Sequence, residues 1–410
     1  MKVAFQTLGC KVNLYETEAL RQLYEDLHYD VVDFDQFADC YVINTCSVTA
    51  VADKKSRQMI HRARKQNPKA RIVVTGCYVQ NMSEEEKASL GADQILDNEG
   101  KRKLLATVRL REMKTRTRAD IKIEDGCDQY CSYCIIPYRR GHVKSRSSQE
   151  ILEEVKSLAK AGHREVVLTG INTSAFGTDT GESLADLIEG IACAKGIERI
   201  RLSSLEPRVI TEEFLKVLRR TPKFCPHFHL SLQSGCDRTL KAMNRHYTTS
   251  EYREKAAMIR EAFEHPALTT DIIVGFPGET REDFDQSRVF ADEMAFFHMH
   301  IFPYSKRSGT RAASMADQVS RQTKQRRVDL MEEVDRKNSA AFAGYYLGKT
   351  VRILPEEQET LDGSLYLTGH TDTYVRAMLP LTEEPDFEMQ TGIVTKILPD
   401  NTLICDRIVQ

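Results

Sequence analysis

The sequence lacks the features that would assign it to several common protein classes. No apolar run approaches the roughly 20 residues that a membrane-spanning helix needs, and the first ten residues look like a strand with one Lys rather than a secretory signal. The formal net charge is only −2, so composition alone indicates no charged partner. Neither an internal repeat nor a G-x-G-x-x-G dinucleotide fingerprint occurs. We therefore expect a cytoplasmic protein with no membrane partner.

The length and composition predict several ordinary folded domains. The 410 residues are 41% hydrophobic and 29% charged, which excludes a disordered or collagen-like chain. Domains usually span roughly 100–200 residues, so two or three are expected. A chain of this size buries about 75% of its unfolded surface, so the fold does not need disulfides.

Residues 1–112 alternate between short apolar strands and helices. Strands are expected at 2–8, 41–45 and 71–75, and helices at about 13–27 and 49–66. Val- and Ile-rich strands separated by helices indicate a parallel sheet. This region is therefore predicted to be a small doubly wound α/β domain.

Residues 113–343 repeat the alternation on a larger scale, and residues 344–410 abandon it. Six strand–helix units predict a partial (β/α)6 barrel, with strands at 120–124, 165–169, 199–203, 228–232, 270–275 and 297–302. A long charged helix, about 321–345, closes this region. Beyond it, short strands punctuated by Gly, Pro and Asp predict a small β-barrel. The fold class is α/β, with three domains at 1–112, 113–343 and 344–410.

Eleven cysteines stand out in a chain without an export signal, and such a set indicates metal binding or catalysis before disulfides. Cys127, Cys131 and Cys134 form a CxxxCxxC motif after the first barrel strand. Three thiolates at this spacing can hold three irons of a four-iron, four-sulfur cluster and leave the fourth iron open. Zinc, which prefers four ligands in a closed site, and incidental cysteines are the alternatives.

A second set of cysteines is dispersed in the sequence. Cys10, Cys46 and Cys77 each follow a predicted strand of the N-terminal sheet. The carboxyl ends of parallel strands share one edge, where ligands bind, so we expect these thiols to converge. They indicate a second cluster with three protein ligands and one open iron. The alternative is three separate buried thiols, because free Cys is among the most buried residue types.

The CxxxCxxC motif, with the aromatic Tyr133 before its third cysteine, resembles that of the radical S-adenosylmethionine (radical SAM) superfamily. The resemblance implies that the open iron chelates S-adenosylmethionine through its amino and carboxylate groups. Reduction then cleaves the sulfonium to methionine and a 5′-deoxyadenosyl radical. Cluster and cofactor must touch, and a loop at the carboxyl end of a barrel can bring them together.

The two cysteine sets together resemble the methylthiotransferase family, over essentially the whole chain. Its members have an N-terminal cluster domain, a radical SAM barrel and a C-terminal β-barrel called TRAM. Further segments carry the resemblance, at 134–146, 230–247, 271–280 and 302–310. It implies two four-iron, four-sulfur clusters and S-adenosylmethionine as cofactors, and a catalytic role for all six cysteines.

The resemblance also implies residues that contact S-adenosylmethionine at the barrel mouth. Arg245 suits the carboxylate, because a guanidinium binds it bidentately; a surface salt bridge is the alternative. The other implied contacts are Tyr133, Gly170, Ser203, Glu206, Gln233, Val274 and Tyr304. Glu206 before Pro207 also fits a plain turn.

The opening segment Thr7–Thr17 (TLGCKVNLYET) is similar to the family branch that acts on N6-threonylcarbamoyladenosine at position 37 of tRNA. Isopentenyladenosine of tRNA and an aspartate of a ribosomal protein are the alternative substrates. A nonenzymatic iron–sulfur protein that binds RNA or transfers electrons is an alternative of another class. In the family mechanism, the Cys127/Cys131/Cys134 cluster generates the radical that removes the C2 hydrogen, and the other cluster supplies the methylthio group.

The implied partners are the anticodon stem-loop of tRNA and an electron donor such as flavodoxin or ferredoxin; the sulfur donor is unknown. Residues 54–71 hold eight Lys and Arg with no acid, and residues 99–122 hold nine. Both stretches are expected to contact phosphates. Residues 345–410 hold five Lys and Arg against eleven Asp and Glu, a net charge of −6. That acidity leaves open how much the C-terminal module contributes to tRNA binding.

Overall fold

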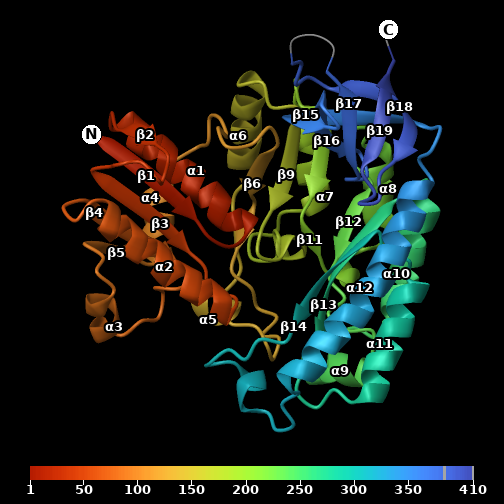
Figure 1. The fold of residues 1–410 in the computed structure, drawn as a ribbon, viewed down its shortest axis with the longest axis horizontal. Helices are drawn as coiled ribbons and strands as arrows, with labels where there is room; N and C mark the ends of the chain where they lie inside the picture. The colour runs from red at the N-terminus through yellow and green to blue at the C-terminus, as the bar shows by residue number, and fades with distance from the viewer. Residues whose placement is uncertain (382–384, 409–410) are drawn as a thin grey trace.

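The N-terminal part of the chain is a parallel sheet with the strand order β2-β1-β3-β4-β5 (Figure 1). The computed structural model describes residues 1–381 and 385–408. The N-terminal elements are β1 (Lys2–Thr7), α1 (Lys11–Asp26), β2 (Asp30–Val32), β3 (Cys40–Thr45), α2 (Ala50–Gln66), β4 (Arg71–Gly76), α3 (Glu84–Ser89), β5 (Gln94–Leu96) and α4 (Asn98–Leu105). This order confirms the expected doubly wound fold.

Both faces of this sheet are buried, which explains why its strands are almost continuous apolar runs. On one face, Val42 and Val73 pack with Leu20 of α1. On the other face, Ile43 and Val74 pack with residues of α2. Successive side chains of a strand point to opposite faces, so each face receives every second residue.

The middle part is a partial barrel of parallel strands in two hydrogen-bonded arcs, β6-β9-β10 and β11-β12-β13-β14. An isolated bridge between Ile200 and Phe224 joins the arcs. The strands are β6 (Ala119–Lys122), β9 (Glu165–Thr169), β10 (Arg199–Leu202), β11 (Ser204–Leu205), β12 (His227–Leu230), β13 (Ala267–Val274) and β14 (His298–Pro303). The six expected barrel strands are therefore present, with β11 as a short continuation of β10.

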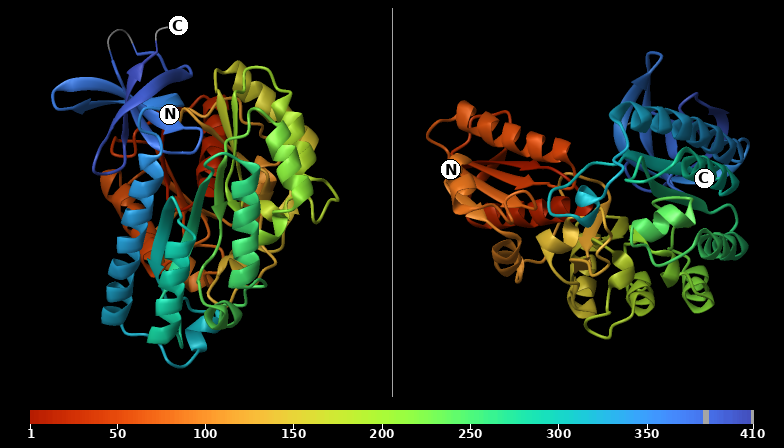
Figure 2. Two further views of the ribbon diagram at one scale, coloured as in Figure 1. Left: turned by 90° about the vertical axis from the view of Figure 1, so that its right-hand side faces the viewer. Right: turned by 90° about the horizontal axis from the view of Figure 1, so that it is seen from below.

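Helices cover the outer side of these strands (Figure 2). They are α6 (Ser148–Lys160), α7 (Leu184–Ala192), α8 (Glu212–Arg220), α9 (Asp237–Ala242), α10 (Thr249–Ala262), α11 (Arg281–Glu293) and α12 (Arg321–Gly344). In the part of the chain that the structure describes, no helix is both long and apolar enough to cross a membrane.

The barrel strands carry apolar residues outward and polar residues inward. Val166, Leu168 and Ile200 belong to the largest core, which lies under the helices. The residues that alternate with them include Glu165 and Arg201, both almost completely buried. The inside of the barrel is thus a polar layer, unlike the branched apolar filling of a complete eight-stranded barrel.

The C-terminal part is a closed barrel with the strand order β15-β16-β17-β19-β18, as the sequence predicts. The strands are β15 (Thr350–Leu361), β16 (Ser364–Thr371), β17 (Arg376–Pro380), β18 (Gln390–Ile397) and β19 (Leu403–Arg407). β15 is twelve residues long because it pairs with the whole length of β16 around a bulge at Pro355.

This C-terminal barrel plugs the amino-terminal end of the partial barrel. The Tyr374 ring stacks on His227, with ring centroids 4.9 Å apart, and Arg201 lies 4.9 Å from the Tyr374 centroid. Arg201 also donates to the backbone oxygen of Asp372 at 2.8 Å, and Arg199 to that of His370 at 2.8 Å. Cation–π contacts and charged hydrogen bonds in a buried setting fix the two parts together.

We expect Glu165→Gln to destabilise this junction in a pH-dependent manner. Burial alone would raise the pKa of Glu165, but the guanidinium groups of Arg201 and Arg199 lower it to about 2. A carboxylate whose pKa is lower in the folded state stabilises the protein above its unfolded pKa, and the stabilisation is lost as the pH falls toward 2. The variant should lose about 3 kcal/mol of unfolding free energy at pH 7. Guanidinium unfolding at pH 7 and pH 3 measures this loss; an equal loss at both values would contradict the assignment.

Candidate active site at the carboxyl ends of two sheets

The loop with Cys127, Cys131 and Cys134 leaves the carboxyl end of the first barrel strand. Two short strands, β7 (Glu124–Asp125) and β8 (Lys144–Ser145), pair across its base, and α5 (Ile136–Arg140) lies within it. Gly126 closes the loop with a φ of +84°, where a Cβ atom would lie 2.0 Å from the His142 backbone oxygen. Only glycine fits both the conformation and the space.

The segment after α9 holds this loop in place. The backbone amide of Ser132 donates to the Met243 oxygen at 2.9 Å, and the Asn244 side chain donates to the Tyr130 oxygen at 3.1 Å. Arg245 Nη1 donates to the Sγ atom of Cys131 at 3.2 Å. These hydrogen bonds to the barrel therefore fix the position of the loop.

The three thiols lie close enough to influence one another. Burial, together with the neighbouring thiols, raises the pKa of Cys127 to about 11 and that of Cys134 to about 12. A site that disfavours isolated thiolates this strongly suits a positively charged metal centre, which binds the thiolates and displaces the protons.

Arg245 and Glu206, two implied cofactor contacts, form a pair beside the cysteine loop. Arg245 Nη2 donates to both carboxylate oxygens of Glu206, at 2.7 and 2.6 Å, and Nε donates to the Tyr247 hydroxyl at 3.1 Å. The structure thus brings these residues together, with the guanidinium already bound to Glu206.

The remaining implied contacts fall into two groups around the mouth. Tyr133 and Tyr304 share a small apolar cluster with Phe276, and Val274 accepts a hydrogen bond from the Tyr304 amide at 2.9 Å. Gln233, with a φ of +70°, bridges to β13 through Asp271 and Ile273. Gly170 and Ser203 lie at the ends of β9 and β10, on the opposite arc.

Glu124 was missed in the sequence. A Cβ atom on Gly170 would lie 2.2 Å from its carboxylate, so the glycine makes room for it. The Glu124 side chain is fully buried and accepts a hydrogen bond from the Asn172 amide. Burial raises its pKa to about 8, which makes it a neutral acid at pH 7, three residues before Cys127. The sequence does not indicate this environment, because Gly170 and Asn172, which surround the carboxylate, are distant from Glu124 in the sequence.

The second set of cysteines converges at the carboxyl edge of the N-terminal sheet, as expected. Cys46 and Cys77 follow the adjacent strands β3 and β4 directly, and Cys10 precedes α1 after β1. A Cβ atom on Gly9 would lie 2.9 Å from the Sγ atom of Cys46. Burial, together with Cys77 and Cys10, raises the pKa of Cys46 to about 11.

Asn13 ties the loops of this set together. Its amide donates to the backbone oxygens of Leu8 at 2.7 Å and Thr45 at 3.0 Å, each close to a cysteine in sequence. Its Oδ1 atom accepts from Arg140 at 2.5 Å. Arg140 belongs to α5, in the loop of the other cysteine set, so Asn13 connects the two.

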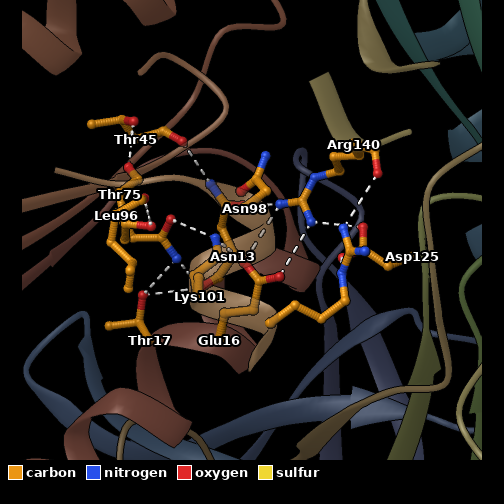
Figure 3. A network of polar contacts seen from close by, with 12 residues as sticks. Asn13, Glu16, Thr17, Thr45, Thr75, Leu96, Asn98, Lys101, Asp125 and Arg140 are labelled. Atoms are coloured by element: carbon orange, nitrogen blue, oxygen red, sulfur yellow. Dashed lines mark hydrogen bonds and ion pairs between the residues drawn. The ribbon is translucent and has the colours of Figure 1, made fainter. Parts of the chain in front are cut away.

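A buried ionic network surrounds this connection (Figure 3). Arg140 binds Asp125 at 2.8 Å and Glu16 at 3.2 Å, and Lys101 binds Glu16 at 2.5 Å. Lys122 completes the network, 3.0 Å from Glu16. Burial alone would raise the pKa of Glu16, but the charges of Lys101 and Arg140 hold it well below its usual range.

The network carries more positive than negative charge. Three cations, Lys101, Lys122 and Arg140, face two carboxylates, Glu16 and Asp125. Among the described residues the buried Nε atom of Arg140 has no hydrogen-bond partner. The guanidinium interacts electrostatically with Cys10 and Cys77. A buried excess charge is costly unless it is compensated. Thiolates of a metal cluster at Cys10, Cys46 and Cys77 fit this requirement.

The structure shows that the basic stretch 99–122 is rich in ion pairs. Each of its nine Lys and Arg side chains lies within 4.0 Å of a carboxylate. Lys114 and Arg111, for example, bind Glu25 and Asp26 of α1. Lys101, Arg118 and Lys122 are buried or nearly so and hold parts of the protein together. Lys103 and Arg111 keep exposed side chains, at 76% and 61%, that a phosphate can reach. In the stretch 54–71, by contrast, Lys54, Lys55 and Lys65 have no carboxylate partner among the described residues.

The inner wall below the mouth holds a polar group that the sequence analysis missed. His229, Asp271 and His300, from β12, β13 and β14, have ligand atoms within 4.8 Å of one another. Both ring nitrogens of His229 are engaged, by Thr269 at 3.1 Å and by Asp271 at 3.3 Å. The group is thus a hydrogen-bonded lining of the barrel interior.

A partial barrel with three cysteines in a loop at its carboxyl end defines the class of radical SAM enzymes. The model of the radical SAM superfamily matches residues 121–291, and that of the uncharacterized protein family UPF0004 matches residues 2–97. Among solved structures, the radical S-adenosylmethionine methyltransferase TsrM from Kitasatospora setae, with cobalamin and a 4Fe-4S cluster bound, shares the fold. Its TM-score is 0.58 at 15% identity, over 76% of this chain and 77% of that one.

Curated relatives match almost the whole chain. The threonylcarbamoyladenosine tRNA methylthiotransferase MtaB of Bacillus subtilis (strain 168) is 40% identical over 93% of this chain and 91% of its own length. The tRNA-2-methylthio-N(6)-dimethylallyladenosine synthase of Methylacidiphilum infernorum (isolate V4) is 33% identical over 93% and 89%. The chain belongs to the methylthiotransferase family, whose members transfer a methylthio group by radical SAM chemistry.

We expect Arg140→Met to weaken iron binding at Cys10, Cys46 and Cys77, because it removes the excess positive charge beside them. The measurement uses a variant with Cys127, Cys131 and Cys134 replaced by Ala, so that only this set can bind. After anaerobic reconstitution, iron per chain should fall at least twofold and the remaining centre should reduce at a more negative potential.

Arg146→Met is the matched control for this prediction. Arg146 is also an arginine paired with a buried carboxylate, Glu154 at 2.8 Å, but no thiol is among the groups that act on it. It should lower stability without shifting the potential. Equal iron content and potential in the Arg140 variant and the parent would contradict the charge argument.

Proposed function

We propose that this protein replaces the C2 hydrogen of N6-threonylcarbamoyladenosine, at position 37 of tRNA, with a methylthio group. One observation carries the proposal: two sets of three thiols lie at the carboxyl ends of two sheets, and a single buried network joins them. One set alone fits a generic radical SAM enzyme. A second set beside it fits a reaction that also transfers sulfur.

The target C–H bond is not acidic, so acid–base catalysis cannot break it. When bound, S-adenosylmethionine and two four-iron, four-sulfur clusters supply the 5′-deoxyadenosyl radical and the methylthio group. Cys127, Cys131 and Cys134 would hold one cluster, and Cys10, Cys46 and Cys77 the other. Each set provides three ligands, which leaves one iron of each cluster for S-adenosylmethionine or for sulfur.

Residues of the chain would orient these groups and compensate their charge. The Arg245–Glu206 pair fixes a positive charge 3.2 Å from Cys131. Arg140 fixes another beside Cys10 and Cys77. Glu124, neutral at pH 7 and buried, would donate a hydrogen bond at the base of the cysteine loop. Tyr133, Tyr304 and Phe276 would exclude water from the radical.

The substrate branch rests on the relatives and on the opening segment. Relatives named for threonylcarbamoyladenosine are up to 40% identical, against up to 36% for those named for dimethylallyladenosine. The segment Thr7–Thr17 supports the same branch. The anticodon stem-loop would be the RNA bound, and flavodoxin or ferredoxin would supply electrons.

We expect Cys77→Ala and Cys127→Ala to separate the two roles. With dithionite and S-adenosylmethionine, the Cys127 variant should form no 5′-deoxyadenosine. The Cys77 variant should still form it, but should bind roughly half the iron and make no methylthio product. Cys193→Ala, which removes an exposed thiol outside both sets, should behave as the parent. Methylthio product from the Cys77 variant would refute the second ligand set.

Nucleoside mass spectrometry of tRNA tests the substrate. Cells without this protein should lose 2-methylthio-N6-threonylcarbamoyladenosine and accumulate the unthiolated nucleoside, and the gene in trans should restore it. Loss of the methylthio-isopentenyl nucleoside instead would assign the other tRNA branch.

A further inference from the structure

Two exposed tyrosines stand on the loop that carries Cys127, Cys131 and Cys134. Tyr130 is 42% exposed and Tyr138 is 50% exposed. Their rings pack edge to face, with centroids 5.8 Å apart. Such pairs usually stabilise a core, but this one projects to the surface beside the candidate active site.

The backbone holds both rings in this position. Tyr130 has a φ of +46°, a left-handed conformation that is strained for residues other than glycine. The Asn244 side chain donates to its backbone oxygen at 3.1 Å. The Asn81 side chain donates to the Tyr138 oxygen at 2.9 Å, which ties the second tyrosine to the N-terminal part. The surface is therefore preorganised.

A hollow with basic walls lies next to Tyr138. Its volume is about 880 Å³, and Tyr138, Lys306, Thr310 and Arg311 are among its lining residues. Lys306 and Arg311 are exposed and have no carboxylate within 4.0 Å in the described part of the chain. The segment 305–316 contains no acidic residue. These charges differ from those of residues 99–122, which are all paired.

We propose that Tyr130 and Tyr138, with Lys306 and Arg311, form a binding surface for unpaired RNA bases. This inference rests on the proposed function, because it names how that substrate is held. Aromatic faces for stacking and unpaired cations for phosphates are what single-stranded RNA sites combine. A base modified at C2 must leave its stack, and the nucleotides beside it then need other partners at the rim of the site.

Binding of a fluorescent anticodon stem-loop to the reconstituted holoprotein tests this surface. Tyr130→Ala and Tyr138→Ala should each weaken binding about 10-fold, the size expected for one stacked base. Tyr138→Phe keeps the ring and should bind as the parent does. Phe37→Ala is the matched control: Phe37 is also an exposed aromatic residue, at 63%, but it precedes β3, at the amino-terminal ends of the strands of the N-terminal sheet.

Salt dependence tests the basic wall independently of the cysteine loop. Lys306→Gln and Arg311→Gln should each reduce the slope of log affinity against log salt by about 0.7, one phosphate on a single strand. Lys216→Gln, on the outer helix α8, should leave the slope unchanged.

Three outcomes would overturn the inference. The first is parental RNA affinity in both Ala variants, and the second is an unchanged salt slope in both Gln variants. The third is parental RNA affinity combined with slower reduction by flavodoxin, which would assign the surface to the electron donor. If instead the parent protein neither binds nor thiolates tRNA, the proposed function fails. Normal thiolation with unaffected variants would overturn only this surface.

Discussion

The ion pair between Glu16 and Arg140 determines how the two halves of the site lie. Glu16 belongs to α1 of the N-terminal sheet and Arg140 to the cysteine loop of the barrel, and neither is exposed. Removing one partner of a buried pair leaves an uncompensated charge, at a cost of about 3–5 kcal/mol. Asp125, two residues before Cys127, and Asn13, three residues after Cys10, contact the same guanidinium. The spacing of the two thiol sets is thus set by packed, charged side chains.

The partial barrel is closed at one end and accessible at the other. At the amino-terminal end, the half-buried Tyr374 and the buried Arg201 close the interior. At the carboxyl end, the cysteine loop, the exposed tyrosines and the hollow beside them remain accessible. The polar inner wall connects these ends, because its side chains bind one another or the C-terminal barrel. A substrate must therefore approach from the carboxyl end.

The sequence predicted those features that depend on local period and on parallel topology. Strands β3, β4 and β9 and the convergence of Cys10, Cys46 and Cys77 follow from apolar runs that end at one sheet edge. It did not predict the three-residue strands β2 and β5, which are too short to show a period. It also did not show that the cations of the stretch 99–122 are paired, because the carboxylates that bind Lys101, Arg111 and Lys114 lie about 85–90 residues away. The raised pKa of Glu124 is hidden for the same reason, since burial by distant residues causes it.

An arginine that is bound to carboxylates lies beside each three-thiol set. Arg245 contacts Cys131 and Glu206. Arg140 interacts electrostatically with Cys10 and Cys77. It also forms ion pairs with Glu16 and Asp125. Thiolates bring negative charge into surroundings that raise their pKa. A lysine or histidine there could respond by changing its own protonation, but a guanidinium stays charged in proteins. A fixed positive charge therefore favours the thiolate form at every working pH, and the carboxylates keep that charge aimed at the sulfur atoms.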